Sequence, residues 1–330
     1  MRSLYLGFLF LFLVTSCQQD APKTESPAPA PPPARVNIPS FDAASAFGYI
    51  EQQVAFGPRD PGSDGHRACR DWLIATFESF GARVTAQDFQ ARDLNNKSYE
   101  ATNIIASFHP EASRRVLLTA HWDTRAHGDY DPDESKHASP ILGADDGGSG
   151  VGVLLEVARL LQANAIDLGV DIVLFDAEDQ GKNNGEDPMS WCQGAQYWGN
   201  KPHVENYMAQ FGIHLDMVGA KNPRFGKEGY SRAYAPQIQQ KVWGMAQGMG
   251  FGMFFVNDLT NPVTDDHKYV NELRRIPTVN IINQPLASET GFGAHWHTHS
   301  DGLEIIDQRS LKAVGQVVIA TVYNTYMQRF

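Results

Sequence analysis

The chain has 330 residues and a formal net charge of −11, with 38 acidic and 27 basic side chains. Binding to nucleic acid needs clustered cations that displace counterions from the phosphates. The sequence contains no run of Lys and Arg, so its composition argues against a nucleic-acid partner. Because one α/β core can reach roughly 250 to 300 residues, the length predicts a single compact domain, residues 40–330, behind an N-terminal tail.

The N-terminal segment has the order of features that is typical of an export signal. Arg2 precedes an apolar stretch, residues 4–14, and Thr-Ser-Cys17 follows this stretch. The stretch is too short to span a membrane as a mature helix, so residues 1–16 are predicted to be a signal peptide. Its end resembles a bacterial lipobox, which implies a lipid on Cys17 and a periplasmic protein anchored to a bacterial membrane. The alternative is an ordinary secreted protein cut near Ser16.

Residues 17–39 are rich in Pro, Ala and Ser. Such a composition favours an extended linker. We therefore expect a lipid-anchored tether that holds the folded domain away from the membrane.

Helical and strand patterns alternate along the domain. Helices are expected at 41–53, 66–80, 151–161, 195–198, 236–248, 265–273 and 307–326. Strands are expected at 82–89, 101–108, 115–120, 170–175, 211–219 and 278–282. This alternation predicts a three-layer α/β/α fold with a mixed, largely parallel central sheet.

Acidic and imidazole side chains follow the predicted buried strands. His121 ends one strand, Asp179 follows the next and Asp216 ends a third, while Asp146 lies in a glycine-rich turn and His297 near the C-terminus. Each alone has a structural alternative, such as a helix cap or a core histidine. Together they supply nitrogen and oxygen donors at the sheet edge where α/β folds bind ligands, a set that suits Zn²⁺ better than Ca²⁺ or Mg²⁺.

Glu178 and Asp179 are adjacent acids at the end of a predicted strand. Consecutive side chains there point in different directions, so Asp179 can bind a metal while Glu178 faces a substrate as a general base or acid. A solvated acidic loop is the alternative.

Five short segments then show a family likeness. They are residues 121–123, 143–146, 176–179, 215–216 and 296–298. In order and spacing they resemble the M28 family of zinc aminopeptidases and glutaminyl-peptide cyclotransferases, from about residue 41 to the C-terminus. Three features favour the cyclotransferase (glutaminyl cyclase) branch: residues 215–225, the Asp265-Asp-His segment with Leu-Arg-Arg after it, and Trp296 before His297.

The resemblance implies one zinc ion per chain, held by Asp146, Asp179 and His297. Glu178 would carry protons while the α-amine of an N-terminal glutamine closes the ring to pyroglutamate and releases ammonia. Further implied roles belong to Asp216 and Asp265, in a hydrogen-bond network, and to Trp296, as a wall for the substrate side chain. Peptides or proteins with N-terminal glutamine would be the substrates.

The alternative is a two-zinc aminopeptidase of the same family. His121 and Asp216 would then hold a second zinc, Asp146 would bridge the two ions, and Glu178 would activate a water molecule. A third class, a tethered peptide-binding protein, should lack at least one of Glu178, Asp179 and His297, and all three are present.

The chain departs from the family pattern at several positions. Many relatives have Glu where this chain has Asp179, and Asn280 occupies the place of a histidine in the animal enzymes. The disulfide of those enzymes is not evident, and Cys69 and Cys192 are expected to be two buried thiols.

Other residues receive structural interpretations. The loop 125–140 could bind a cation, but its mixed charge and lack of regular ligand spacing favour a solvated surface loop. Gly147 and Gly148 are expected to let the turn pass close to a metal. The pattern leaves open whether Trp191, Trp198 and Trp243 line a cleft or fill the core.

Overall fold

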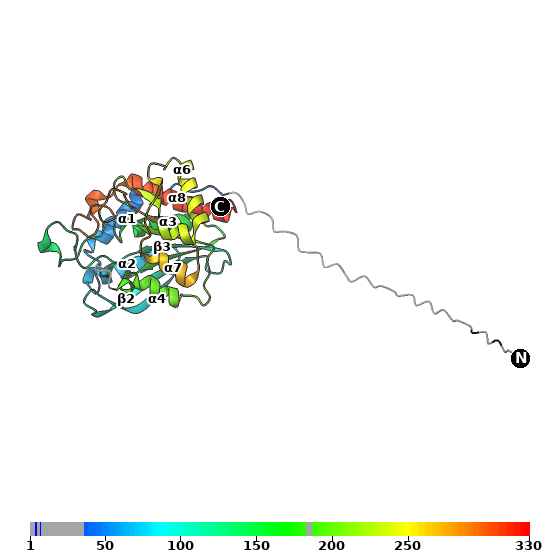
Figure 1. The fold of residues 1–330 in the computed structure, drawn as a ribbon, viewed down its shortest axis with the longest axis horizontal. Helices are drawn as coiled ribbons and strands as arrows, with labels where there is room; N and C mark the ends of the chain where they lie inside the picture. The colour runs from blue at the N-terminus through cyan, green and yellow to red at the C-terminus, as the bar shows by residue number, and fades with distance from the viewer. Residues whose placement is uncertain (1–3, 5–6, 8–35, 183–186) are drawn as a thin grey trace. The chain divides into compact units, whose positions relative to one another are not determined.

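The computed structural model describes residues 4, 7, 36–182 and 187–330. The chain divides into two units, Met1–Pro32 and Pro33–Phe330, and all helices and strands of the described residues lie in the second (Figure 1). The predicted signal peptide, Cys17 and most of the tether fall outside the described residues. Within the described ranges, no helix combines the length and the apolar character that crossing a lipid bilayer requires.

A six-stranded sheet forms the centre of the second unit, in the order β1-β2-β4-β3-β5-β8. β3 pairs in parallel with β4 and β5, and β5 with β8, whereas β1–β2 and β2–β4 are antiparallel. The predicted mixed, largely parallel sheet is therefore confirmed. The strands are β1 (Arg83–Arg92), β2 (Ser98–Phe108), β3 (Arg115–His121), β4 (Gly169–Phe175), β5 (Gly212–Asp216) and β8 (Thr278–Ile282).

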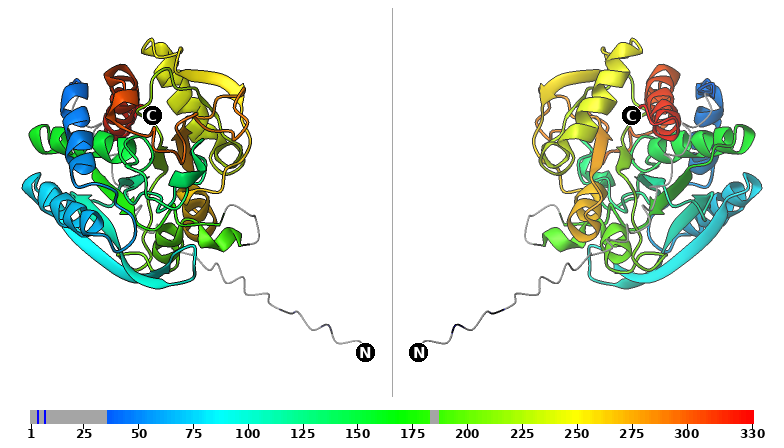
Figure 2. Two further views of the ribbon diagram at one scale, coloured as in Figure 1. Left: turned by 90° about the vertical axis from the view of Figure 1, so that its left-hand side faces the viewer. Right: turned by 90° about the vertical axis from the view of Figure 1, so that its right-hand side faces the viewer.

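Helices cover both faces of this sheet (Figures 1 and 2). The larger apolar cluster packs one face against α1 (Ala43–Ala55), α2 (Asp64–Ser79), α3 (Ser149–Ala163), α6 (Pro236–Gly248) and α8 (Gln308–Tyr326). The smaller cluster packs the other face against α4 (Gln193–Asn200) and α7 (Asp266–Arg274). Three layers result, as predicted.

Neighbouring residues of one strand serve the two faces in turn. Ile104 belongs to the larger cluster and Ile105 to the smaller one, and on β3 the same alternation separates Leu118 from Leu117. Because side chains of a strand point to opposite faces, a strand covered on both sides becomes a continuous apolar run. This is why the sequence pattern of the central strands could be interpreted correctly.

The structure also contains short elements that the sequence pattern did not predict. β6 (Phe225–Lys227) and β7 (Phe255–Leu259) form a separate two-stranded sheet, and α5 (Gly229–Tyr234) follows β6. Three 3₁₀ turns complete the fold: η1 (Glu134–Lys136), η2 (Pro188–Ser190) and η3 (Leu303–Ile305). Elements of three to six residues are too short for a periodic pattern to identify.

The first turn of α3 packs directly against the central strands. A Cβ atom added at Gly150 would lie 2.5 Å from the carbonyl oxygen of Leu215 on β5 and 3.0 Å from the Cβ of Ala120 on β3. Only a residue without a side chain permits this approach. The loop before α3, which contains Asp146, is thereby held at the carboxyl ends of β3 and β5.

Gly150→Ala should lower the free energy of unfolding by roughly 1 to 3 kcal/mol, because the added methyl group overpacks the contact with β5. Gly244→Ala is the matched control: Gly244 lies on α6 with no atom within 4 Å of an added Cβ. This control should gain about 0.5 to 1 kcal/mol from helix propensity. Urea denaturation measures both, and an equal response of the two variants would contradict the packing described.

Candidate active site

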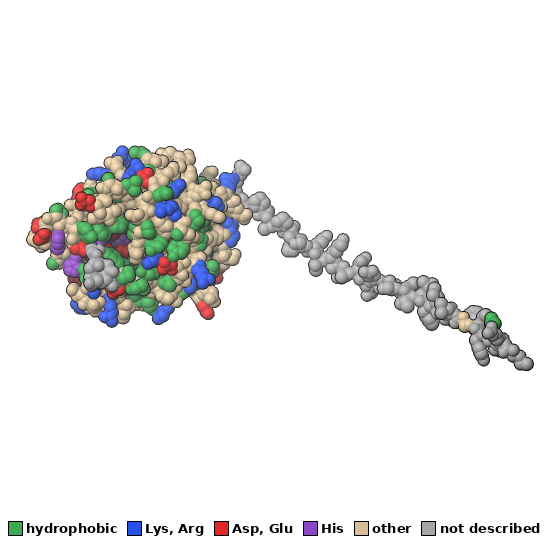
Figure 3. Space-filling view, viewed as in Figure 1, with side chains coloured by type: hydrophobic (Ala, Val, Ile, Leu, Met, Phe, Trp, Pro, Cys, Tyr) green, Lys and Arg blue, Asp and Glu red, His purple; other side chains and the backbone are tan. Residues whose placement is uncertain are grey.

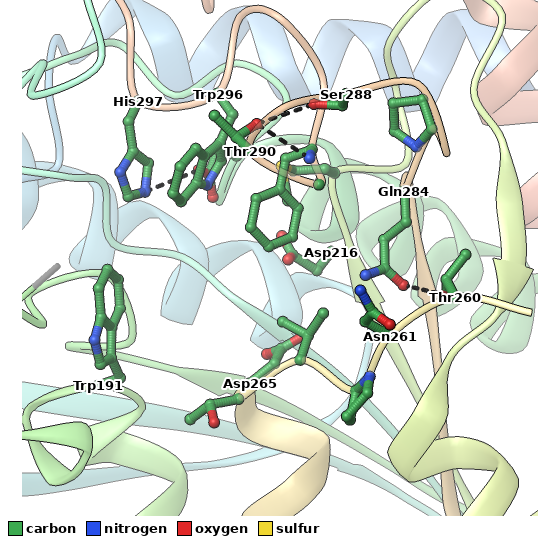
Figure 4. A pocket seen from close by; sticks show the side chains of 18 of the residues that line it. Trp191, Asp216, Thr260, Asn261, Asp265, Gln284, Ser288, Thr290, Trp296 and His297 are labelled. Atoms are coloured by element: carbon green, nitrogen blue, oxygen red, sulfur yellow. Dashed lines mark hydrogen bonds and ion pairs between the residues drawn. The ribbon is translucent and has the colours of Figure 1, made fainter. Parts of the chain in front are cut away.

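A cavity of about 470 Å³ opens at the carboxyl ends of the parallel strands (Figure 4). Its lining includes Asp146, Glu178, Asp179 and Asp216, and its far wall is made by the segments after β7 and β8. His297 and Trp296 line it from the loop before η3. Its volume is within the range of a small-molecule or peptide-end site.

Asp146, Asp179 and His297 meet at the floor of this cavity, with ligand atoms close enough to share one ion. The Nε2 atom of His297 lies 3.0 Å from Oδ1 of Asp179 and 3.9 Å from Oδ2 of Asp146. All three residues are buried, and Oδ2 of Asp146 and Oδ2 of Asp179 find no hydrogen-bond partner among the described residues. Buried carboxylate oxygens without partners are costly unless a cation completes them.

The loop that carries Asp146 is fixed by two buried charged side chains. The carboxylate of Asp301 accepts hydrogen bonds from the amides of Asp145 (2.7 Å) and Asp146 (3.0 Å). From the other side, the guanidinium of Arg59 donates to the carbonyl oxygens of Leu142 and Gly143. Asp146 therefore does not cap α3; the backbone presents it to the cavity.

Asp123 fixes the two adjacent acids. Its carboxylate accepts hydrogen bonds from the backbone amides of Glu178 (3.0 Å) and Asp179 (3.2 Å). Ala177, just before them, has a φ of 57°, a conformation that non-glycine residues rarely adopt. This turn directs the two side chains apart: Asp179 joins Asp146 and His297, whereas Glu178 lies with Cys192 and Asp265.

The ring of His297 is oriented by a carboxylate behind it. Its Nδ1 atom lies 3.2 Å from Oδ1 of Asp129, which also forms an ion pair with Arg125 (2.7 Å). Burial raises the pKa of Asp129, but the neighbouring His297 ring and the hydrogen bonds from Arg125 outweigh it and hold that pKa well below its ordinary value. A carboxylate in this position fixes the tautomer, so that Nε2 faces the ligand cluster.

Glu178 lies beside the cluster with its carboxylate on the cavity. The thiol of Cys192 donates to Oε1 of Glu178 at 3.2 Å. Burial raises the pKa of this carboxyl well above its ordinary value, and the charges of Asp179, Asp266 and Asp265 add to the increase. A carboxyl group with a raised pKa can both accept and return a proton near neutral pH.

Asp265 belongs to a buried network of histidines and acids. His214 Nε2 lies 3.0 Å and His267 Nδ1 3.7 Å from its oxygens, and Asn280 donates to it. Behind it, His267 Nε2 is 3.0 Å from Glu228, and contacts with Asp265 and Glu228 raise the pKa of His267 to about 9 despite its burial. Asn280 thus contacts the acid directly.

A second group of candidate ligands adjoins the first. His121 Nε2 lies 3.1 Å from Oδ1 of Asp146 and 3.3 Å from Oδ1 of Asp216, and the three can surround one ion. Burial, with the charges of Asp265 and Asp146, raises the pKa of Asp216 to about 8. The five ligand candidates from the sequence are therefore all brought together, around two adjoining positions that share Asp146.

Aromatic rings form one side of the cavity. Trp296 stacks on His297 with ring centres 3.6 Å apart, and its other contacts are Tyr130 and Phe292. Trp191 lines the opposite side, parallel to His297. Trp198 and Trp243 are buried in the two apolar clusters, which resolves the question that the sequence left open.

The sequence interpretation of one loop needs correction. The loop 125–140 is not wholly a solvated surface loop, because Arg125 and Asp131 are buried and Asp129 contacts His297. The part around η1 does project, and histidine and acidic side chains are visible at that edge (Figures 1 and 3). The expectation for Gly147 is not contradicted: an added Cβ at this position, where φ is 83°, would lie 2.3 Å from the Asp123 carbonyl oxygen and 3.2 Å from Cε1 of the candidate ligand His121.

Cys69 and Cys192 are separate buried thiols, as expected. The sequence placed Asp123 in a family-like segment but assigned no supporting role to Asp123, Asp129 or Asp301, although all three are acids near predicted ligands in the chain. Their role depends on contacts with segments that are remote in sequence.

The residues fit a zinc ion. Two carboxylates and one imidazole leave a fourth position open, as in catalytic zinc sites, and each of the two carboxylates has an oxygen without a hydrogen-bond partner among the described residues. The contact between His297 and Asp129 supplies the usual outer support of a zinc-bound histidine.

Comparison with known proteins agrees with this chemistry. The model of Peptidase family M28 matches residues 103–322. A Zn-dependent exopeptidase from Parabacteroides distasonis is 49% identical with a TM-score of 0.86, covering 87% of this chain and 100% of that chain. A glutaminyl cyclase from Bacteroides thetaiotaomicron is 47% identical with a TM-score of 0.84, covering 87% of this chain and 99% of its own.

A curated relative, the glutaminyl-peptide cyclotransferase of Drosophila melanogaster, is 23% identical over 272 residues, which are 76% of this chain and 72% of that protein. The family match spans most of the folded unit and includes all five candidate metal ligands: His121, Asp146, Asp179, Asp216 and His297. The chain belongs to Peptidase family M28, a family of zinc enzymes.

Proposed function

We propose that this protein is a glutaminyl-peptide cyclotransferase, which converts the N-terminal glutamine of peptides and proteins to pyroglutamate and releases ammonia. The observation that carries the proposal is the 47% identity with a bacterial glutaminyl cyclase over nearly the full length of both folded chains. The geometry supports it, because an acid with a raised pKa, Glu178, lies beside a separate ligand cluster on one cavity.

The ring closes within one substrate molecule. The α-nitrogen forms a bond with the side-chain amide carbon, and the bond from that carbon to the amide nitrogen breaks. Glu178 takes the proton that the α-amine loses and transfers it to the departing nitrogen, which leaves as ammonia. Because the nucleophile is part of the substrate, the enzyme needs to orient only one molecule, and the reaction consumes no water.

The proposed zinc ligands are Asp146, Asp179 and His297, for one ion per chain. When bound, zinc polarises the side-chain carbonyl of the substrate glutamine and stabilises the charge that develops on its oxygen. Asp216 and Asp265, both on the cavity, would orient the reacting groups through hydrogen bonds. Trp296 would be the flat wall that holds the glutamine side chain against the metal centre.

A second candidate function is a two-zinc aminopeptidase. It is favoured by the likeness to a Zn-dependent exopeptidase and by the adjoining group of His121, Asp146 and Asp216. In that enzyme Glu178 would take a proton from water instead of from the substrate amine.

The products released from two dipeptide amides distinguish the two functions. With glutamine-alanine amide and leucine-alanine amide as substrates, the cyclotransferase releases ammonia from the first and nothing from the second. Release of free leucine would instead identify the aminopeptidase. An enzymatic ammonia assay together with chromatography of the amino acids measures both products.

Glu178→Gln should reduce turnover by roughly 10² to 10⁴-fold, the usual contribution of a general acid–base group. The substitution keeps the shape of the side chain and the metal ligands, so zinc content and the melting temperature should stay close to those of the wild type. Activity within tenfold of the wild type would mean that another group carries the proton.

Zinc content tests the ligand assignment. Wild-type protein should bind one zinc per chain, Asp179→Asn and His297→Ala should bind far less, and His121→Ala should keep its zinc. A chelator should lower the melting temperature of the wild type, because bound ligand stabilises the native state. Mass spectrometry of the bound metal measures the number of zinc ions per chain. Two zinc ions, one of them lost in His121→Ala, would support the aminopeptidase.

We further propose that the protein is a lipoprotein of the periplasmic side of a bacterial membrane, with residues 1–16 as signal peptide and the catalytic domain on a tether from Cys17. The support is the order of charged, apolar and small residues before Cys17.

Cys17→Ser should move the protein from the membrane fraction to the soluble fraction of fractionated cells, because the lipid would have no attachment site. Cys69→Ser, which alters a buried thiol of the folded domain, is the control and should remain with the membranes. A Cys17→Ser variant that stays in the membrane fraction would contradict the anchor.

A further inference from the structure

The cavity extends beyond the metal centre between two wall segments, residues 259–264 after β7 and 284–292 after β8. The residues of these wall segments that line the cavity are all uncharged, whereas the acidic lining residues all belong to the metal end. The cavity therefore has a charged half that suits the reacting glutamine and a neutral half that the proposed reaction leaves unexplained.

Gln284 is the most constrained polar side chain of the neutral half. It is 7% exposed, and its Oε1 atom accepts a hydrogen bond of 2.6 Å from the hydroxyl of Thr260 (Figure 4). This bond fixes the carboxamide so that its NH₂ group faces the cavity near Asn261. No described residue accepts a hydrogen bond from that NH₂ group, and the Asn261 carboxamide is likewise without a partner in the described part of the chain.

The NH₂ group is open to the cavity, so water or a bound ligand can supply its hydrogen-bond acceptor. A carboxamide has the same donor and acceptor groups as a peptide bond, so a peptide carbonyl is a natural partner. An N-terminal glutamine with its side chain at the metal must send its main chain away from the acids. The neutral half offers that path.

We propose that the wall segments bind the main chain of the residues that follow the N-terminal glutamine, with the Gln284 carboxamide donating to a peptide carbonyl. This inference rests on the proposed cyclotransferase function and adds to it a contact that binds the residues after the glutamine. Thr260 is the positioning residue that orients the Gln284 carboxamide. Because the lining is neutral, recognition depends on the main chain and not on charged side chains.

The test compares glutamine amide with the tripeptide amide Gln-Ala-Ala-NH₂, which lose the same ammonia from the same side chain. The ratio of their kcat/KM values isolates the contribution of the added main chain. Wild-type enzyme should prefer the tripeptide amide. Gln284→Met, nearly equal in size but without donors, should reduce this ratio by about 2- to 12-fold, the effect of one hydrogen bond.

Three further variants control the experiment. Thr260→Val should reduce the ratio as Gln284→Met does, whereas Thr260→Ser keeps the hydroxyl and should restore it. Gln247→Met makes the same substitution at an exposed position of α6 outside the cavity lining, and should leave the ratio unchanged.

An unchanged ratio in both Gln284→Met and Thr260→Val, including an equal loss on both substrates, would overturn the subsite while the cyclotransferase function stands. If Gln284→Met does not fold, the Thr260 pair decides by itself. Wild-type protein that releases ammonia from neither substrate would overturn the proposed function, and the subsite with it.

Discussion

Repulsion among buried carboxyl groups at one end of the sheet is the constraint on which the rest of the structure depends. The groups that crowd there are Asp123, Asp146, Glu178, Asp179, Asp216, Asp265 and Asp266. Burial and mutual repulsion raise the pKa values of several of them. Such a cluster is stable only with cations and directed hydrogen bonds, which histidines, Arg125 and backbone amides supply.

The supporting groups hold the metal-ligand candidates in fixed positions and keep Glu178 separate from them. Asp123 and Asp301 accept hydrogen bonds from backbone amides next to the predicted ligands, and Asp129 orients the ring of His297. A zinc ion can therefore bind to side chains that are already held in position. Glu178 remains outside this ligand set and faces the cavity, where its proton can be used.

The active-site cavity has two chemically different ends, one acidic and one neutral. Acids surround the position of the reacting glutamine, while the wall segments provide carboxamides and apolar side chains along the remaining length. The short β6–β7 sheet matters here, because one wall segment begins where β7 ends. This small element, which no periodic pattern predicted, thus contributes to the proposed recognition of the peptide main chain.

The sequence by itself determined the layered fold, the strands that end in acids and histidines, and the membership of the zinc family, because apolar periodicity and adjacent motif residues are local properties of the chain. Only the tertiary structure decided which acids share a position, why Glu178 and Asp179 separate, and that Asp129, Asp123 and Asp301 support the site. Those contacts join segments far apart in the chain. They depend on the strand order β1-β2-β4-β3-β5-β8 and on side-chain packing, neither of which a local pattern encodes.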